Sequence, residues 1–364
     1  MTPRARPSSA LGVDVGGTFT DLVGWDGDRV VTGKVASTVD QSEVVVEGAI
    51  EIGDGDFEHF LHGTTVATNA LLERKGAVTA LVTSPGFVDV LEIGRQDRPS
   101  LYDSFVDRPE PLVPPRLRYP ADRSFTAADF DEVDAVAVSV LYGYERQTEE
   151  AEVARRIADL HPAAAIARSG RVAPEFREFE RTSTTVLNAY LMPAVGRYLR
   201  GLVDRAGSAG LPTEIAVKRS SGGLMPVAEA AQLPAAILLS GPAGGVVAAA
   251  ALGDALGRDR IVTFDMGGTS TDVCRIEQGR PEITYGRTID GYACLMPSVA
   301  IHTVGAGGGS IAWVDPGGSL RVGPQSSGSV PGPACYAMGG VEPTVTDANV
   351  QLGRIDPRAR LAGS

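Results

Sequence analysis

Short apolar runs separated by tight turns recur along this chain, and each half contains three of them in close succession. Apolar runs bounded by Gly, Asp and Asn are typical of β-strands. In both halves the first two runs are joined by a Gly-Gly turn, the pattern of a β-hairpin. The six predicted strands are residues 10–15, 19–25, 29–34, 260–266, 271–276 and 281–285.

Longer segments with apolar residues three and four positions apart predict helices between these strands. The predicted helices are residues 42–52, 64–75, 149–160, 174–206 and 241–256. Further buried strands are predicted at residues 57–62, 78–83, 135–141 and 214–218. Pro193 is expected to break the longest helix, because proline lacks a backbone donor and clashes with the preceding turn. Strands that alternate with helices in both halves predict an α/β fold with mixed sheets.

The length of 364 residues favours two domains over one. We expect a first lobe over residues 1–175, a connecting helix over 176–206 and a second lobe over 207–364. The spacing between the two strand triplets is too long for a solenoid repeat and indicates two related lobes.

The eight-residue pattern D-x-G-G-T-x-T-D occurs once in each half, at residues 14–21 and 265–272, with six identical positions. Glycines let the backbone turn tightly, and successive N–H groups in such a turn form an anion site. A generic tight turn explains one copy equally well, but two copies favour phosphate binding. The residues predicted to hold a nucleotide phosphate are Gly16, Gly17, Thr18, Thr20, Gly267, Gly268, Thr269 and Thr271.

An aspartate ends the incoming strand of each hairpin. Asp14 and Asp265 are the predicted catalytic carboxylates and Mg²⁺ ligands, since phosphate-bound Mg²⁺ takes one or two acidic ligands. Phosphoryl transfer itself needs mainly positioning and charge neutralisation. The chain has no P-loop pattern and no dinucleotide fingerprint after a strand.

Two glycine-rich segments offer further backbone donors. The loop 305–310, with Gly307 and Gly308, is expected to approach the nucleotide, because so many adjacent glycines cost conformational entropy without a packing return. The alternative is a tight turn. The helix start at residues 240–245 could hold an anion or could simply be packed by small residues.

Substrate contacts are predicted at a second strand-to-helix junction and in the loops. His62, Thr64 and Thr65 could line a pocket or cap the following helix. Arg95 could bind a substrate carboxylate as a fork, or be a solvated surface charge. His302 could be a ligand or a base, or be structural.

The composition is that of an ordinary globular protein, with 43% hydrophobic and 21% charged residues. A net charge of −12 without any Lys/Arg block argues against nucleic acid or an anionic membrane as the main partner. No apolar run is long enough to span a bilayer, and we expect a cytoplasmic protein.

Seven segments spread along the whole chain resemble the ATP-dependent hydantoinase/oxoprolinase family, of the hydantoinase A type with acetone carboxylase-like relatives. The Gly-Gly-Thr hairpin alone is common to a wider superfamily, whereas the seven segments together are highly specific. They are residues 12–21, 62–70, 174–190, 239–243, 264–273, 304–312 and 331–336.

The resemblance implies duplicated actin-like (ribonuclease H-like) ATPase lobes, with the two hairpins as their phosphate motifs. It also implies ATP and Mg²⁺ as cofactors, and ATP-driven hydrolysis of a small cyclic amide such as a hydantoin or 5-oxoproline. A B-type hydantoinase subunit is the implied partner.

The chain departs from the family pattern in three places. The later Gly-Gly-x-Gly-Pro element that contacts adenosine is absent, so we expect the C-terminal part to be missing or to come from another polypeptide. Ala300 stands where relatives often have an acidic residue, and residues 141–146 differ from the usual strand and loop. An ATP-dependent carboxylase subunit and a non-catalytic nucleotide- or partner-binding paralogue are therefore the alternatives.

Overall fold

The computed structural model describes residues 9–16, 19–38, 40–53, 57–103, 105–328 and 330–358. Within them the chain forms two compact units. The first unit comprises residues 1–241 and 284–298, and the second comprises residues 242–283 and 299–364. The helix expected to connect two lobes lies inside the first unit, and the lobe boundaries expected from the sequence stay a prediction.

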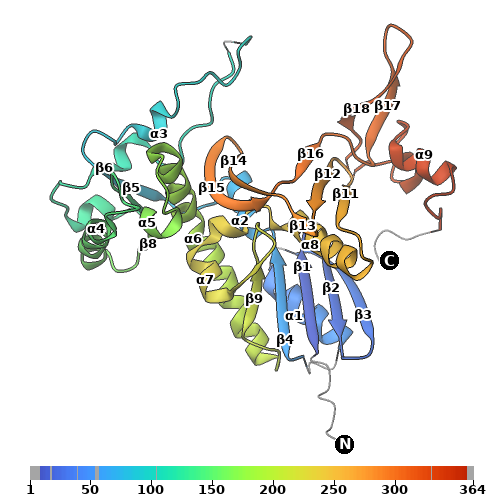
Figure 1. Cartoon of the computed structure of the whole chain (residues 1–364), viewed down its shortest axis with the longest axis horizontal. Helices are drawn as coiled ribbons and strands as arrows, with labels where there is room; N and C mark the ends of the chain where they lie inside the picture. The colour runs from blue at the N-terminus through green and yellow to red at the C-terminus, as the bar shows by residue number, and fades with distance from the viewer. Residues whose placement is uncertain are drawn as a thin grey trace, which may run out of the picture. The chain divides into compact units, whose positions relative to one another are not determined.

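The first unit is built on a six-stranded sheet in the order β10-β9-β4-β1-β2-β3 (Figure 1). Its strands are β1 (Ala10–Val15), β2 (Phe19–Trp25), β3 (Val30–Ala36), β4 (His59–Thr64), β9 (Ile215–Lys218) and β10 (Leu224–Pro226). Strands β1 to β3 form an antiparallel meander, whereas β4 pairs in parallel with both β1 and β9. Alternate residues of β1 (Leu11, Val13 and Val15) are buried, as the apolar pattern predicts.

A second sheet of the first unit is parallel and has the order β6-β5-β7-β8. Its strands are β5 (Thr79–Thr83), β6 (Arg118–Pro120), β7 (Ala135–Ser139) and β8 (Ala165–Arg168). The remaining short elements of this unit are helices. They are α1 (Gln41–Ile52), α2 (Val66–Leu72), α3 (Val90–Ile93), α4 (Gln147–Leu160), α5 (Ser169–Val172), α7 (Val227–Gln232), and the 3₁₀ turns η1 (Pro115–Leu117), η2 (Ala127–Phe130) and η3 (Pro234–Ile237).

One long helix, α6 (Glu178–Ser208), packs against β7 and β8 of the second sheet and against the helices α1 and α2. The predicted break at Pro193 is wrong, because the helix continues through that residue for 31 residues in all. Most of its length is buried, and packing on several sides offsets the backbone hydrogen bond that proline cannot make.

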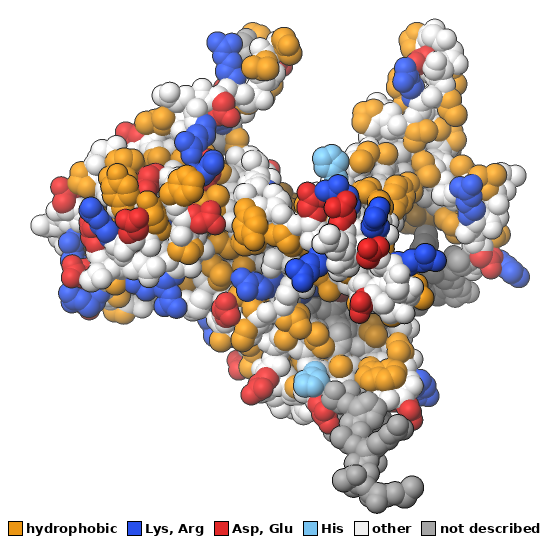
Figure 2. Space-filling view, in the orientation of Figure 1, with side chains coloured by type: hydrophobic (Ala, Val, Ile, Leu, Met, Phe, Trp, Pro, Cys, Tyr) orange, Lys and Arg blue, Asp and Glu red, His pale blue; other side chains and the backbone are white. Residues whose placement is uncertain are grey.

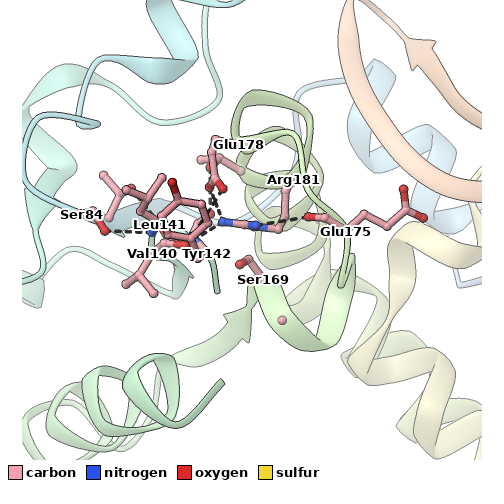
Figure 3. A network of polar contacts seen from close by, with 12 residues as sticks. Ser84, Val140, Leu141, Tyr142, Ser169, Glu175, Glu178 and Arg181 are labelled. Carbon is pink, nitrogen blue, oxygen red and sulfur yellow. Dashed lines mark hydrogen bonds and ion pairs between the residues drawn. The ribbon is translucent and has the colours of Figure 1, made fainter. Parts of the chain in front are cut away.

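A fully buried arginine anchors the first turn of α6 (Figure 3). The Arg181 guanidinium donates to the carbonyl of Val140 at 2.7 Å and forms an ion pair with Glu178. Glu178 also accepts from the backbone N–H of Tyr142. The loop after β7 is thereby attached to the start of α6.

A ribbon from late in the chain, β14 (Ile283–Ile289) and β15 (Tyr292–Val299), belongs almost entirely to the first unit. Ser183 of α6 donates its hydroxyl to the carbonyl of Ala293, and Leu295 donates its N–H to Thr184. The prediction of one strand over residues 281–285 is wrong, because these residues are divided between β13 (Arg280–Pro281) and β14.

The second unit contains most of α8 (Ser240–Ala255) and a hairpin of β11 (Arg260–Met266) and β12 (Thr271–Glu277), which also pairs with β13 and β16 (His302–Val304). Another hairpin, β17 (Ser310–Val314) with β18 (Leu320–Ser326), precedes η4 (Ala334–Tyr336) and α9 (Val345–Gln351). The apolar core of this unit is small: Ala243, Val246, Ala250, Cys274, Ile276 and Val299. Figure 2 shows hydrophobic side chains at its surface.

No helix within the described part of the chain combines the length and the apolar character needed to cross a membrane.

Candidate functional site

The two D-x-G-G hairpins have the same register. Asp14 lies opposite Asp21 in the first hairpin, as Asp265 lies opposite Asp272 in the second. In each, the first glycine donates its N–H to the carbonyl three residues later, Gly16 to Phe19 and Gly267 to Ser270, at 2.9 Å in both cases. The repeated sequence therefore encodes a repeated backbone geometry.

In the first unit, the carboxylate of Asp14 lies near an ammonium group. Lys218 Nζ is 3.7 Å from Asp14 Oδ1 and also donates to the carbonyl of Gly241 at 3.1 Å. The Lys218 side chain is 18% exposed and that of Asp14 is 53% exposed. A mostly buried cation thus lies beside a half-exposed carboxylate, so that opposite charges meet at one point of the sheet.

A glycine makes room for this pair. Gly63 is the partner of Asp14 in the β1–β4 register. A Cβ atom added at Gly63 would lie 2.3 Å from Asp14 Oδ1 and 3.3 Å from Lys218 Nζ. A side chain at this position would therefore push the carboxylate of Asp14 aside.

Each hairpin carries two like charges across its strands, which is unfavourable unless they are neutralised. In the first hairpin, Lys34 Nζ lies 2.6 Å from Asp21, and Lys218 lies near Asp14. In the second, the Thr303 hydroxyl donates to Asp272 at 2.7 Å. The carboxylate of Asp265, unlike its backbone, has no hydrogen-bond or ion-pair partner among the described residues.

The last threonine of each motif is used inside the protein. The hydroxyl of Thr20 is fully buried and lies 3.1 Å from that of Ser37, which donates to the carbonyl of Gly16. Thr271 is also buried and donates its hydroxyl to the carbonyl of Ala306. Both threonines hold a neighbouring loop against the hairpin, and their phosphate contact stays a prediction.

Of the remaining residues in the two hairpin turns, Gly17 and Thr18 lie outside the described residues. Gly268 and Thr269 are exposed at the turn of the second hairpin, where a ligand can reach them.

The glycine-rich loop packs on the second hairpin. Gly308 donates its N–H to the carbonyl of Gly267 at 2.8 Å, and Gly309 donates to that of Gly268 at 2.6 Å. A Cβ atom at Gly307 would lie 2.7 Å from the hairpin backbone. The expectation that these glycines have no packing return is therefore wrong, because close backbone contact requires them. Nucleotide binding by Gly307 and Gly308 stays a prediction.

The predicted substrate residues at the β4–α2 junction are largely internal. His62 is 1% exposed, and its Nε2 lies 2.9 Å from the hydroxyl of Tyr198. Burial, with a smaller effect of the Lys218 charge, lowers the pKa of His62 to about 3, so the ring is neutral near pH 7. The hydroxyl of Thr64 accepts from the N–H of Val66, and that of Thr65 accepts from Asn69.

The other two predicted substrate residues lie elsewhere. Arg95 forms a two-pronged ion pair with Glu180, at 2.8 and 2.6 Å, and lines a pocket between the loop around residue 100 and α6. His302 is exposed on β16, opposite Val273, in the second unit. The residues predicted to bind the nucleotide therefore fall into two groups. Asp14, Gly16 and Thr20 belong to the first unit, and the second hairpin with its glycine-rich loop belongs to the second unit.

The row of Asp14, Gly63 and Lys218 suits a phosphate group and a hydrated Mg²⁺ ion. It provides a cation for phosphate oxygens, a carboxylate for the metal shell, and a gap that a Cβ would fill. Among the described residues, no three His, Cys, Asp or Glu side chains are grouped to hold a metal by themselves. Sequence reasoning missed Lys218, because its place beside Asp14 arises from the strand order β9-β4-β1.

Family models match nearly the whole chain. The model described as hydantoinase/oxoprolinase matches residues 181–363, and that of the hydantoinase/oxoprolinase N-terminal region matches residues 10–160. The caprolactamase subunit alpha of Pseudomonas jessenii is 35% identical, over 97% of this chain and 56% of its own length. The 5-oxoprolinase of Saccharomyces cerevisiae is 31% identical, over 95% of this chain and 32% of its own length.

Two solved structures of related proteins are similar to this chain along almost its whole length. The crystal structure of the ATP-dependent caprolactamase from Pseudomonas jessenii is similar with a TM-score of 0.85, at 34% identity, over 98% of this chain and 56% of that one. Nucleotide-free acetone carboxylase is similar with a TM-score of 0.75, at 25% identity, over 99% of this chain and 57% of that one. The mixed α/β, actin-like ATPase fold is confirmed. The chain spans about half the length of these relatives, or less.

Proposed function

Because this chain belongs to the hydantoinase/oxoprolinase family, we propose that it acts as the nucleotide-binding subunit of an ATP-dependent hydrolase that opens a cyclic amide ring, such as a hydantoin or 5-oxoproline. The names of its relatives, caprolactamase and 5-oxoprolinase, support this class of substrate. The observation that carries the proposal is the row of Asp14, Gly63 and Lys218 at the first hairpin.

The chemistry requires activation, since an unstrained amide resists hydrolysis. In the proposed reaction the terminal phosphoryl group of ATP moves to the carbonyl oxygen of the ring, leaving ADP. A first water then adds to the ring carbon and the C–N bond breaks, which leaves an open-chain acyl phosphate and frees the ring nitrogen as an amino group, or as a ureido group for a hydantoin. A second water cleaves the acyl phosphate to the carboxylic acid and inorganic phosphate. ATP, cyclic amide and two water molecules thus yield ADP, phosphate and the open-chain acid.

The residues of this chain would supply positioning and charge. The Lys218 ammonium would balance the charge of the phosphate oxygens, and Asp14 would hold Mg²⁺ through its water shell. The exposed turn residues Gly268 and Thr269 of the second hairpin would add backbone N–H hydrogen bonds to phosphate. Asp265 is proposed to play the role of Asp14 at the second hairpin.

We also propose that a further polypeptide segment, from a B-type subunit or a C-terminal continuation, completes the second unit. In the first unit β1 has β2 on one side and the parallel β4 on the other, whereas β11 pairs with β12 alone within the described residues. Val262 and Phe264 on β11 are 67% and 68% exposed. An apolar strand with an open edge is normally covered by another strand.

An ATP-dependent carboxylase subunit is the second candidate function, favoured by the similarity to acetone carboxylase. Both candidates consume ATP at the same hairpins and differ in what accepts the phosphoryl group.

The test is a calorimetric titration of the chain with Mg-ATP, followed by assays of ADP release with hydantoin, 5-oxoproline, caprolactam, and acetone with bicarbonate. The Asp14→Asn/Asp265→Asn double variant should lose saturable binding. An Asp159→Asn/Asp254→Asn variant, changed at two exposed acids away from the hairpins, should bind as the wild type does. Equal binding by both variants would overturn the assignment of the hairpins.

A further inference from the structure

The first unit contains a large pocket to which the reaction above assigns no role. Its volume is about 920 Å³, within the range of small-molecule sites. Three segments that are distant in sequence form it: residues 91–112, the start of α6 and the ribbon β14–β15, drawn in orange beside α6 in Figure 1.

One wall of the pocket is apolar. Phe179 and Val186 project from α6, Leu295 comes from the ribbon, and Leu91 and Leu112 come from the first segment. Val186 and Leu295 are almost fully buried. This wall can hold the hydrocarbon body of a small molecule.

Most of the charges around the pocket cancel one another or are solvated. Arg95 pairs with Glu180 at 2.6 Å, and Arg108 pairs with Asp97 at 3.0 Å. The remaining rim charges are exposed, where water and salt screen them strongly. They are Arg98, Arg177, Asp107 and Glu175.

Arg287 on β14 differs from these rim charges. Its guanidinium donates to the carbonyl of Leu238 at 2.6 Å, while its buried Nε has no acceptor among the described residues. No carboxylate of the described residues lies within ion-pair distance of it. Burial lowers the pKa of Arg287, and burial also raises the pKa of the neighbouring Cys294 thiol, which therefore stays neutral.

A guanidinium withdrawn from water without a carboxylate partner is unfavourable by itself, and an anion relieves that cost. We propose that this pocket binds a small organic carboxylate, with the carboxylate on Arg287 and the hydrocarbon body against Phe179, Val186 and Leu295. The proposal does not rest on the hydrolase reaction, since none of these residues belongs to the hairpins.

The experiment compares two probes of nearly equal shape, cyclohexanecarboxylate and its neutral amide, by calorimetry and ligand-observed NMR on the intact chain. The carboxylate should bind saturably with a Kd of about 1 mM or lower, and the amide should bind at least about tenfold more weakly, as expected for loss of one charge-assisted hydrogen bond. Equal binding of the two probes, or no saturable binding of the carboxylate, would overturn the proposal. This comparison needs no variant.

Arg287→Gln should weaken carboxylate binding at least about tenfold. The matched control is Arg155→Gln, an exposed arginine on α4 whose loss should change nothing. The Asp14→Asn/Asp265→Asn variant should retain carboxylate binding, even where Mg-ATP no longer binds. Loss of carboxylate binding in that variant would place the carboxylate at the hairpins and sink the proposal.

Discussion

The ammonium nitrogen of Lys218 lies 3.7 Å from Oδ1 of Asp14, and the strand carrying Gly63 runs between the two strands that carry them. The register explains the contact. Asp14 on β1 is opposite Gly63 on β4. His62 and Val217, which directly precede Gly63 and Lys218, are opposite each other on β4 and β9. The three residues therefore form a row across the sheet, and the missing side chain in the middle lets the outer two meet.

Replacing Lys218 by methionine should weaken Mg-ATP binding about tenfold or more, because a cation near the phosphate site is removed while the apolar stem is kept. The measurement is a calorimetric titration, with thermal unfolding to confirm the fold. Lys34→Met is the matched control, since Lys34 is an exposed lysine paired with Asp21 on the same sheet. Equal affinities of the two variants would rule out a special role for Lys218.

Gly63→Ala should displace the carboxylate of Asp14 from its place beside Lys218. The new methyl carbon would lie 2.3 Å from Asp14 Oδ1, so the carboxylate or the strand must move. We expect weaker Mg-ATP binding and a loss of about 1–3 kcal/mol in the free energy of unfolding, typical of overpacking. Gly223→Ala, where a Cβ meets nothing within 4 Å, should leave both quantities nearly unchanged. Unchanged Mg-ATP binding and unchanged stability of Gly63→Ala would show that neither depends on the close contact between position 63 and Asp14.

His62 should make the protein less stable as the pH falls from about 6.5 towards 3. Its folded-state pKa is lowered to about 3 from 6.5, so in this window the unfolded chain binds a proton that the folded chain excludes. The contribution is fully present above pH 6.5 and is lost at up to about 1.4 kcal/mol per pH unit below it.

Urea unfolding of the wild type and of His62→Gln between pH 4.5 and 8 would measure this effect. The variant should show a flatter pH profile, whereas His59→Gln, at an exposed histidine of the same strand, should retain the wild-type profile. Parallel profiles for wild type and His62→Gln would contradict the assignment.

The open edge of β11 should cause self-association of the isolated chain. Val262→Thr/Phe264→Thr keeps a strand-forming sequence but removes two exposed apolar side chains, so it should reduce concentration-dependent light scattering. Leu352→Thr, at another exposed apolar residue away from the strand, is the control. Unchanged light scattering of the β11 variant would show that this edge does not cause the self-association.

The hairpins could be predicted from the sequence because their signals are local. A Gly-Gly turn between two apolar runs determines the pairing of its own flanks, and six repeated positions produced the same register twice. The actin-like fold followed from the resemblance and is confirmed by the solved relatives.

Lys218 and Arg287 could not be predicted, because their neighbours are distant in sequence. Lys218 reaches Asp14 only through the order of β9, β4 and β1, and Arg287 meets the carbonyl of Leu238 only where the ribbon packs on the first unit. The reason for Gly307 was likewise hidden, since it depends on contact with the second hairpin.

The ribbon β14–β15 also determines when the first unit can finish folding during translation. Ile289, Leu295 and Met296 belong to the main core of the first unit, yet the β11–β12 hairpin of the second unit precedes them in the chain. A ribosome releases these residues only after that hairpin has emerged, so the first unit must wait with part of its apolar surface uncovered. The pocket around Arg287 therefore stays incomplete until residues 284–298 have emerged.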